Sequence, residues 1–193
     1  IKNNKPFYLQ ISHYAVHLAI THSEKNIHKY SKLKKGQKHF VPAFAAMTED
    51  MDEGIGILLD KIAALGIGDN TYIFFLSDNG GRTSIPIGPK QKRDRNFPLR
   101  GGKGSMYEGG LRVPFVVSGP GVSSNTHSDV PVTGLDILPA VARLAGYNDP
   151  LPEIIYGMLL QSPVSGIHRV VKKPASEHFL SVHDPQELGM ISD

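Results

Sequence analysis

The sequence predicts an α/β fold: a mainly parallel sheet flanked by helices. Apolar runs rich in β-favouring residues occur at 7–12, 71–76 and 114–118, and helical periodicity occurs at 42–65 and 136–144. Strands that alternate with helices in this way are typical of parallel sheets, because each helix carries the chain back across the sheet. At 193 residues, 40% of them hydrophobic, the chain is long enough to bury one core.

Composition excludes several functional classes. The chain has no cysteine, which rules out disulfides, thiolate zinc sites and a thiol nucleophile. No apolar run approaches the roughly 20 residues of a membrane-spanning helix, so we predict no membrane span. The net charge of +3 includes two basic clusters, whose members are Lys29, Lys32, Lys34, Lys35 and Lys38, and Lys90, Lys92, Arg93 and Arg95. Without interleaved aromatic residues these clusters predict solvated loops and no nucleic-acid partner.

The first predicted strand, residues 7–12, ends in a polar turn that carries His13 and His17. It begins without a preceding helix or cap, so we expect a fold truncated at the amino terminus. Either histidine could donate a hydrogen bond to an anionic oxygen or protonate a leaving group. Two alternatives stay open: a zinc site, which lacks a nearby third ligand, or a polar loop whose histidines are satisfied locally.

The longest predicted helix spans residues 42–65 and ends at Gly66 and Gly68, because glycine readily adopts the left-handed conformation that closes a helix. Its apolar residues recur at three- and four-residue spacing and form one stripe. They are Phe44, Met47, Met51, Ile55, Leu58, Leu59 and Ile62.

Asp78 and Asn79 follow directly after the apolar strand 71–76, within the sequence Ser-Asp-Asn-Gly-Gly. Ligands of open α/β sheets bind beyond the carboxyl ends of the strands. A carboxylate and an amide oxygen at that position suit calcium or magnesium, which prefer hard oxygen ligands. The same residues are also common in tight turns, so a purely structural turn is the alternative.

Residues 82–110 are rich in glycine and lack periodicity, which predicts a long functional loop. Glycines on both sides of Lys103 allow the backbone to bring its ammonium group close to an oxyanion. A merely flexible loop is the alternative. Glu108 and Arg112 form an i, i+4 ion pair if this segment is helical.

The strand at 114–118 precedes a helix at 136–144, in which Pro139 is tolerated because it lies in the first turn. We expect one α/β catalytic-domain portion over residues 1–147. The proline-punctuated segment 148–193 is expected to wrap the sheet or to begin a small carboxyl-terminal subdomain.

Four segments together resemble the sulfatase family, which belongs to the alkaline phosphatase superfamily. The resemblance covers residues 6–147 and rests on PFYLQISHYAVH, AMTEDMDEGIGILLDKIAALGIGDNTYIFFLSDNGG, LRGGKGSMYEGGLRVPFVVSGPG and GLDILPAVARLAG, in the family's order. It implies an alkaline phosphatase-like fold and the hydrolysis of sulfate monoesters in a small molecule or a glycan. It also implies a periplasmic, extracellular or lysosomal location.

The resemblance implies a role for each candidate residue. Asp78 and Asn79 correspond to calcium ligands, Lys103 to a contact of a sulfate oxygen, and His17 to the histidine that bonds the substrate sulfate. His13 has no firm counterpart, and we expect it to face the substrate or to support His17. The family's nucleophile is a formylglycine made from cysteine or serine in a Cys/Ser-x-Pro-x-Arg motif.

The sequence departs from the family pattern at important points. It contains no Cys/Ser-x-Pro-x-Arg motif and no early strand with paired aspartates, and it has Val16-His17-Leu18-Ala19 where the family has Pro-His-x-Pro. We therefore expect a fragment that is inactive alone and binds calcium weakly. Two other functions stay open: a phosphomonoesterase or phosphonate hydrolase of the same superfamily, and a noncatalytic module that binds sulfated glycans.

Overall fold

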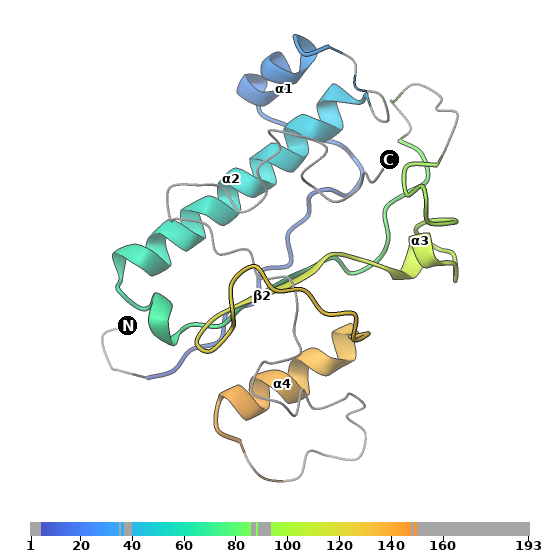
Figure 1. Cartoon of the computed structure of the whole chain (residues 1–193). Helices are drawn as coiled ribbons and strands as arrows, with labels where there is room; N and C mark the ends of the chain where they lie inside the picture. Colours follow the sequence, from blue (N-terminus) through green and yellow to red (C-terminus); the bar gives the residue numbers. More distant parts are fainter. Residues whose placement is uncertain are drawn as a thin grey trace.

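The structure is a computed structural model that describes residues 5–34, 36, 40–85, 88, 94–147 and 149. The predicted segment 148–193 therefore lies outside the described residues, apart from residue 149. Eight short elements follow one another along the chain (Figure 1). They are α1 (Glu24–Ser31), α2 (Pro42–Ala64), η1 (Gly68–Asn70), β1 (Ile73–Leu76), α3 (Glu108–Leu111), β2 (Phe115–Ser118), η2 (Gly134–Asp136) and α4 (Ile137–Leu144).

Helix α2 confirms the longest predicted helix. It begins at Pro42, whose fixed φ angle and missing amide hydrogen suit the first turn of a helix. It ends where Gly66 adopts a φ of 65°. Ala46 and Met47 on this helix are among the most buried apolar residues of the described chain. None of the described helices has both the length and the apolar character needed to cross a membrane.

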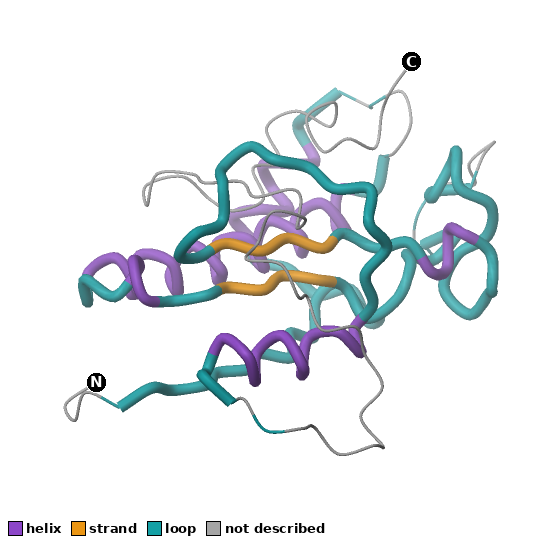
Figure 2. Tube along the Cα trace, turned by 60° about the horizontal axis from the view of Figure 1, so that its bottom comes forward, coloured by secondary structure: helices purple, strands orange, loops and turns teal. Residues whose placement is uncertain are grey.

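Strands β1 and β2 confirm two predicted strands but not their predicted direction. They pair antiparallel, with Ile73 opposite Ser118 and Leu76 opposite Phe115. The parallel arrangement is therefore wrong for this pair, because direction depends on how the connecting loop returns and not on the composition of a strand. Figures 1 and 2 show the two-stranded ribbon lying between α2 and α4.

The first predicted strand does not form. Residues 7–12 have no strand assignment, and Phe7, Tyr8 and Leu9 are 55%, 67% and 63% exposed. A strand is defined by hydrogen bonds to a neighbouring strand, and β-favouring side chains alone do not supply them. The β1–β2 ribbon accordingly contains two strands, and the described segment that precedes α1 runs alongside it as irregular chain.

Helix α4 confirms the second predicted helix, and a capping box closes the start of η2, the short helix that leads into it. Thr133 accepts a hydrogen bond from the amide of Leu135, while the Asp136 carboxylate accepts one from the amide of Thr133 at 2.6 Å. Pro139 lies in the first turn and is buried together with Ala140. The capping box therefore fixes the point at which the chain after β2 turns into η2, which continues into α4.

Helix α1 was not predicted, because its residues are mostly polar and show no apolar stripe. Its amino terminus is capped by Ser23, which accepts a hydrogen bond from the amide of Asn26 at 3.2 Å. Asn26 is fully buried against α2, and Tyr30 is also buried. Helix α1 therefore packs against α2 mainly through polar side chains. A polar contact of this kind leaves no periodic pattern of apolar residues in the sequence.

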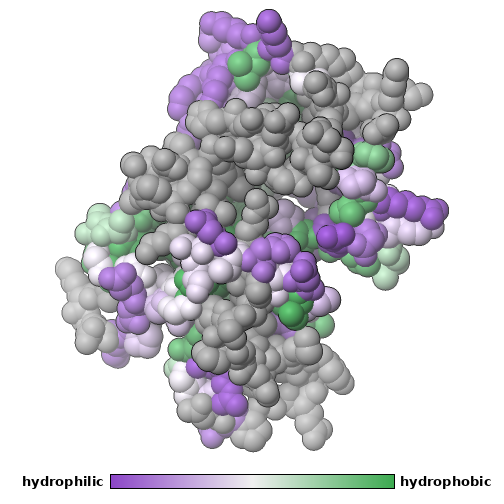
Figure 3. Space-filling model, in the orientation of Figure 1, coloured by the Kyte–Doolittle hydropathy of each residue, from purple (hydrophilic) through white to green (hydrophobic). Residues whose placement is uncertain are grey.

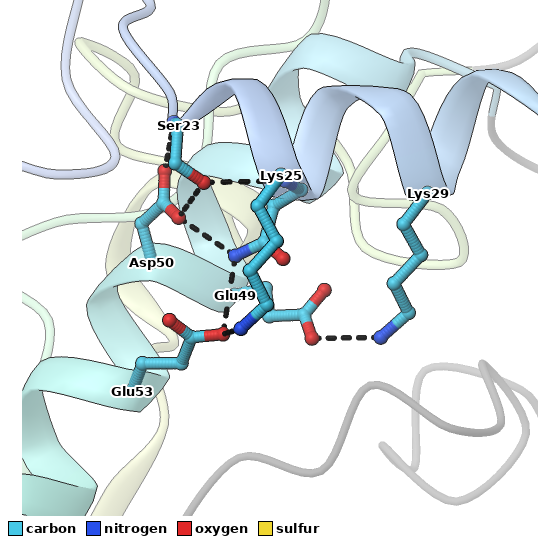
Figure 4. A network of polar contacts seen from close by, with 7 residues as sticks. Ser23, Lys25, Lys29, Glu49, Asp50 and Glu53 are labelled. Carbon is cyan, nitrogen blue, oxygen red and sulfur yellow. Dashed lines mark hydrogen bonds and ion pairs between the residues drawn. The ribbon is translucent and has the colours of Figure 1, made fainter.

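Asp50 on α2 lies at the centre of the polar contact between the two helices (Figure 4). Its carboxylate accepts hydrogen bonds from the amide and hydroxyl of Ser23, at 2.6 and 2.7 Å, and from the side chain of Asn26 at 2.7 Å. Burial by itself raises the pKa of Asp50, but the hydrogen bonds from Ser23 and Asn26 outweigh burial and lower the pKa overall.

Two ion pairs flank this contact. Lys25 lies 2.6 Å from Glu53, and Lys29 lies 2.7 Å from Glu49. Figure 3 shows hydrophilic side chains gathered over α1 on this face of the molecule. Because Lys29 already has a carboxylate partner, one member of the first basic cluster is not free to bind an external anion.

Replacing Asp50 with asparagine should lower the free energy of unfolding by about 2 kcal/mol at pH 7, because three hydrogen bonds to a carboxylate are lost or weakened. The folded protein lowers the pKa of Asp50, so the contribution of its carboxylate is present above the ordinary pKa and lost as pH falls through the folded pKa. The difference between wild type and Asp50→Asn should therefore shrink below about pH 4.

Urea denaturation at several pH values measures this difference. Asp60→Asn is the matched control, because Asp60 lies on the exposed face of the same helix. A difference that persists unchanged at the lowest pH at which the protein folds would contradict a role for the Asp50 carboxylate.

Candidate functional site

The turn that follows β1 carries the first two candidate residues. The Ser77 hydroxyl donates a hydrogen bond to the carbonyl oxygen of Asn79 at 2.9 Å, and the Asn79 side-chain nitrogen donates one to the carbonyl oxygen of Gly80 at 3.0 Å. These short-range bonds shape the turn locally. Asp78, between Ser77 and Asn79, is exposed at the end of the strand. The residues that form the tight turn are therefore also the candidate metal ligands.

The oxygen atoms of this turn could supply two ligands of a calcium shell. Because Asn79 uses its amide nitrogen in the bond to Gly80, its amide oxygen is the atom that can serve as a ligand. Together with the exposed carboxylate of Asp78, this provides two hard oxygen ligands, and calcium takes six to eight. Within the described part of the chain, no group of three or more histidine, aspartate or glutamate residues could hold a metal ion.

The loop that carries Lys103 lies directly against the Asp78–Asn79 turn. The amide of Lys103 donates to the carbonyl oxygen of Gly81 at 2.9 Å, and the amide of Gly80 donates to the carbonyl oxygen of Gly110 at 2.9 Å. These two bonds join segments that are far apart in sequence. The structure therefore brings the Lys103 loop and the candidate metal ligands together.

The two segments approach so closely that side chains do not fit between them. A Cβ atom added at Gly80 would lie 1.9 Å from the carbonyl oxygen of Gly109, and one at Gly102 would lie 2.4 Å from that of Gly81. Both positions face rigid backbone atoms that cannot move aside. Gly80 and Gly102 are thus needed for the contact itself.

Asn96 links both segments through its side chain and was not singled out from the sequence. Its side-chain nitrogen donates to the carbonyl oxygens of Gly81, at 2.7 Å, and Gly101, at 2.9 Å. A single asparagine in a loop rich in polar residues has no distinguishing pattern. Its role becomes visible only when both acceptor segments are in place.

Lys103 itself is held by its backbone while its side chain is exposed. Gly101 and Gly104 on either side have φ angles of 75° and 85°, which side chains rarely tolerate. The hydroxyl of Ser105 accepts a hydrogen bond from the amide of Gly102 at 3.1 Å and closes the loop. An anchored backbone with an exposed ammonium group suits electrostatic contact with an anion.

Short-range contacts support the rest of this loop. The Arg100 guanidinium carbon lies 3.8 Å from the centre of the Tyr107 ring. The predicted ion pair between Glu108 and Arg112 is confirmed at 3.3 Å, but both side chains are exposed, so it stabilises α3 only weakly. Met106, at 84% exposed, and Leu111 are apolar side chains of the same segment that are also exposed.

His13 and His17 make local contacts. His13 accepts a hydrogen bond from the amide of Ala15 at 3.0 Å. The ring of His17 lies 5.8 Å from that of Tyr14, and its Nδ1 lies 2.8 Å from the carbonyl oxygen of Leu18. In residues 5–34, 40–85 and 94–147, no hydrogen bond links either histidine to the Asp78 turn or the Lys103 loop. Their predicted roles at the site stay predictions.

Comparison with known proteins decides the family. The family model described as Sulfatase matches residues 1–147, which is most of the chain. The chain belongs to the sulfatase family. The predicted resemblance to the sulfatase family is thereby confirmed. Membership of this family supports sulfate ester hydrolysis as the general type of reaction.

Individual relatives agree with this assignment. A sulfatase of Formosa agariphila is 36% identical over 167 residues, which cover 79% of this chain and 28% of the relative. Human steryl-sulfatase is 32% identical over 180 residues, which cover 92% of this chain and 28% of the relative. The chain therefore spans under a third of the length of these two relatives.

A solved structure gives the same result for the fold. The crystal structure of Ps i-CgsB in complex with k-i-k-neocarrahexaose is 32% identical, with a TM-score of 0.58 over 74% of this chain and 30% of that one. A second structure of Ps i-CgsB is 33% identical, with a TM-score of 0.56, and covers 70% of this chain and 28% of that one. The described elements thus follow the fold of a sulfatase.

Replacing Gly80 with alanine should separate the Lys103 loop from the Asp78–Asn79 turn, because the added Cβ clashes with the Gly109 carbonyl oxygen. We expect the free energy of unfolding to fall by about 3 kcal/mol. Gly54→Ala is the control: its Cβ meets nothing within 4 Å, and alanine in a helix should stabilise by up to about 1 kcal/mol. Equal stabilities of the two variants in urea denaturation would show that the close contact is absent.

Proposed function

We propose that this chain supplies part of the active site of an enzyme that hydrolyses sulfate monoesters. The observation that carries the proposal is the hydrogen bond from the amide of Lys103 to the carbonyl oxygen of Gly81. This bond joins the backbone of Lys103 to the turn that carries Asp78 and Asn79, whose oxygens could serve as ligands, and it supports the proposal in a chain of the sulfatase family. A sulfate group with three terminal oxygens needs both a cation and hydrogen-bond donors around it.

In the proposed site, Asp78 and Asn79 hold calcium, which when bound offsets negative charge on the sulfate oxygens. Lys103 contacts another sulfate oxygen through its exposed ammonium group. His17 donates a hydrogen bond to the substrate sulfate, and His13 supports it or faces the substrate. Each of these groups acts by binding and orienting the sulfate as charge moves onto the departing oxygen.

The nucleophile of the proposed reaction is supplied from outside these 193 residues. The sequence contains neither cysteine nor a Ser-x-Pro-x-Arg motif, so no residue of this chain fits a formylglycine precursor. Two calcium ligands also leave most of a calcium shell open. We therefore propose that the chain is inactive alone and that the complete protein supplies the nucleophile and further acidic ligands.

The substrate class follows from the same chemistry. We propose a sulfate monoester of a small molecule or a glycan, because the site recognises the sulfate group and not what carries it. The similar structure of Ps i-CgsB holds k-i-k-neocarrahexaose, which supports an oligosaccharide as the carrier. The relatives named steryl-sulfatases support other carriers in the same family.

The two alternative functions have less support. A phosphomonoesterase or phosphonate hydrolase would need a different nucleophile, and the family model that matches describes sulfatases. A noncatalytic glycan-binding module would depend on the basic clusters, but Lys29 is already paired with Glu49. Lys35 and Lys38 of the first cluster, and Lys90, Lys92 and Arg93 of the second, lie outside the described residues.

Replacing Lys103 with alanine in the complete protein should lower kcat/KM for an aryl sulfate by about 100-fold or more, because a preorganised cation no longer faces the developing charge. Lys61→Ala is the matched control, since Lys61 is an exposed lysine in the last turn of α2. Steady-state hydrolysis measures both variants. Wild-type rates in the Lys103 variant would refute its contact with the sulfate.

Calcium binding provides an independent test. We expect the complete protein to bind calcium and the isolated chain to bind it weakly or not at all, because the isolated chain offers only two of the ligands. Asp78→Asn in the complete protein should weaken binding, since it removes the negative charge of one ligand. Calorimetric titration measures calcium binding by the complete protein, by its Asp78→Asn variant and by the isolated chain. Tight binding by the isolated chain that is unchanged by Asp78→Asn would place calcium elsewhere.

A further inference from the structure

Arg95 is a half-buried cation that the proposed reaction does not use. Its backbone amide donates to the carbonyl oxygen of Thr83 at 3.2 Å, which anchors it to the segment just after the Asp78–Asn79 turn. Its guanidinium carbon lies 4.2 Å from the centre of the Phe44 ring, in the first turn of α2. The side chain therefore has a defined position against an aromatic face.

The charge of Arg95 is not balanced by any described carboxylate. Within residues 5–34, 40–85 and 94–147, no acidic group forms an ion pair with it, and its buried Nε has no hydrogen-bond partner. The first turn of α2, which it packs against, contains no acidic residue. Lys25, Lys29 and Arg112 differ in this respect, because each has a carboxylate within 4.0 Å.

An arrangement of this kind is costly without an anion. Burial lowers the pKa of the Arg95 guanidinium, which reflects loss of water around the charge. The ring of Phe44 compensates only in part. The Arg95 Nε is the one guanidinium nitrogen among the described buried atoms without a hydrogen-bond partner. A planar guanidinium group matches a sulfate or a carboxylate, because its nitrogens can donate two parallel hydrogen bonds.

The backbone of Arg95 is also held beside the candidate site through the next residue in the chain, Asn96. Asn96 donates hydrogen bonds to the carbonyl oxygens of Gly81 and Gly101, the two segments that hold the Asp78–Asn79 turn and Lys103. The backbone of Arg95 is therefore anchored next to both segments, and its side chain extends from there onto the ring of Phe44. One ligand that carries two anionic groups could engage both Arg95 and Lys103.

We propose that Arg95 is a specificity residue that binds a second oxyanion group, a sulfate ester or a carboxylate, next to the sulfate that is hydrolysed. The proposal rests on the proposed sulfatase function and narrows its substrate to polyanionic glycans. Such a residue raises the affinity for the substrate without taking part in the chemical step.

The experiment compares three ligands by calorimetry with the complete protein: a monosulfated disaccharide, a disulfated one, and a monosulfated one that carries a carboxylate. Wild type should bind at least one dianionic ligand about tenfold more tightly than the monosulfated one, which is typical of one added charged hydrogen bond. Arg95→Gln should remove that advantage and leave the monosulfated affinity unchanged. The dianionic ligand that binds more weakly to this variant than to wild type shows whether the second group is a sulfate or a carboxylate.

Two further variants separate recognition from a structural role. Arg95→Lys keeps the charge but not the fork, so it should restore part of the advantage. Arg112→Gln removes an exposed arginine at the carboxyl-terminal cap of α3 and should change nothing. The proposal is overturned if Arg95→Gln weakens all three ligands equally, if the advantage persists in that variant, or if wild type does not discriminate. Hydrolysis of the monosulfated ligand is measured in parallel: its absence alongside Arg95-dependent binding overturns only the sulfatase function.

Discussion

Contact between two glycine-rich backbones is the constraint on which the candidate site depends. Gly80 and Gly81 approach Gly109 and Gly102 at distances that leave no room for a Cβ atom. Backbone hydrogen bonds can form at this spacing only because side chains are missing. The residues whose backbones form this contact thus carry no side-chain groups, and the Asn96 side chain adds hydrogen bonds to both segments. The groups with chemistry, Asp78 and Lys103, are exposed on either side of the contact.

The antiparallel ribbon gives this contact its position. Leu76 at the end of β1 lies opposite Phe115 at the start of β2, so the long loop between the strands leaves and returns at the same end of the ribbon. Phe74 and Phe115 pack edge to face, with ring centres 6.5 Å apart, and tie the strands together. Asp78 and the Lys103 loop therefore meet through the pairing of strands that flank them.

The charged groups of this chain fall into two kinds: those compensated within the protein, and those that have no ion-pair partner among the described residues. At the junction of α1 and α2, Asp50 is hydrogen-bonded by Ser23 and Asn26, so its charge is compensated within the protein. At the rim of the candidate site, Asp78, Lys103 and Arg95 form no ion pair with another described residue. Charge that is satisfied internally stabilises the fold, whereas charge left open at a rim is available for an anion or a metal ion.

The sequence by itself determined the features that depend on near neighbours. The apolar stripe of α2, the place of Pro139 in the first turn of α4, the positions of β1 and β2, and the Glu108–Arg112 pair all follow from spacing of a few residues. The antiparallel direction, the missing strand at 7–12, the docking of α1, and the contacts of Asn96 and Arg95 became visible only in the tertiary structure. Each of these depends on a partner distant in the chain, and local patterns carry no information about such partners.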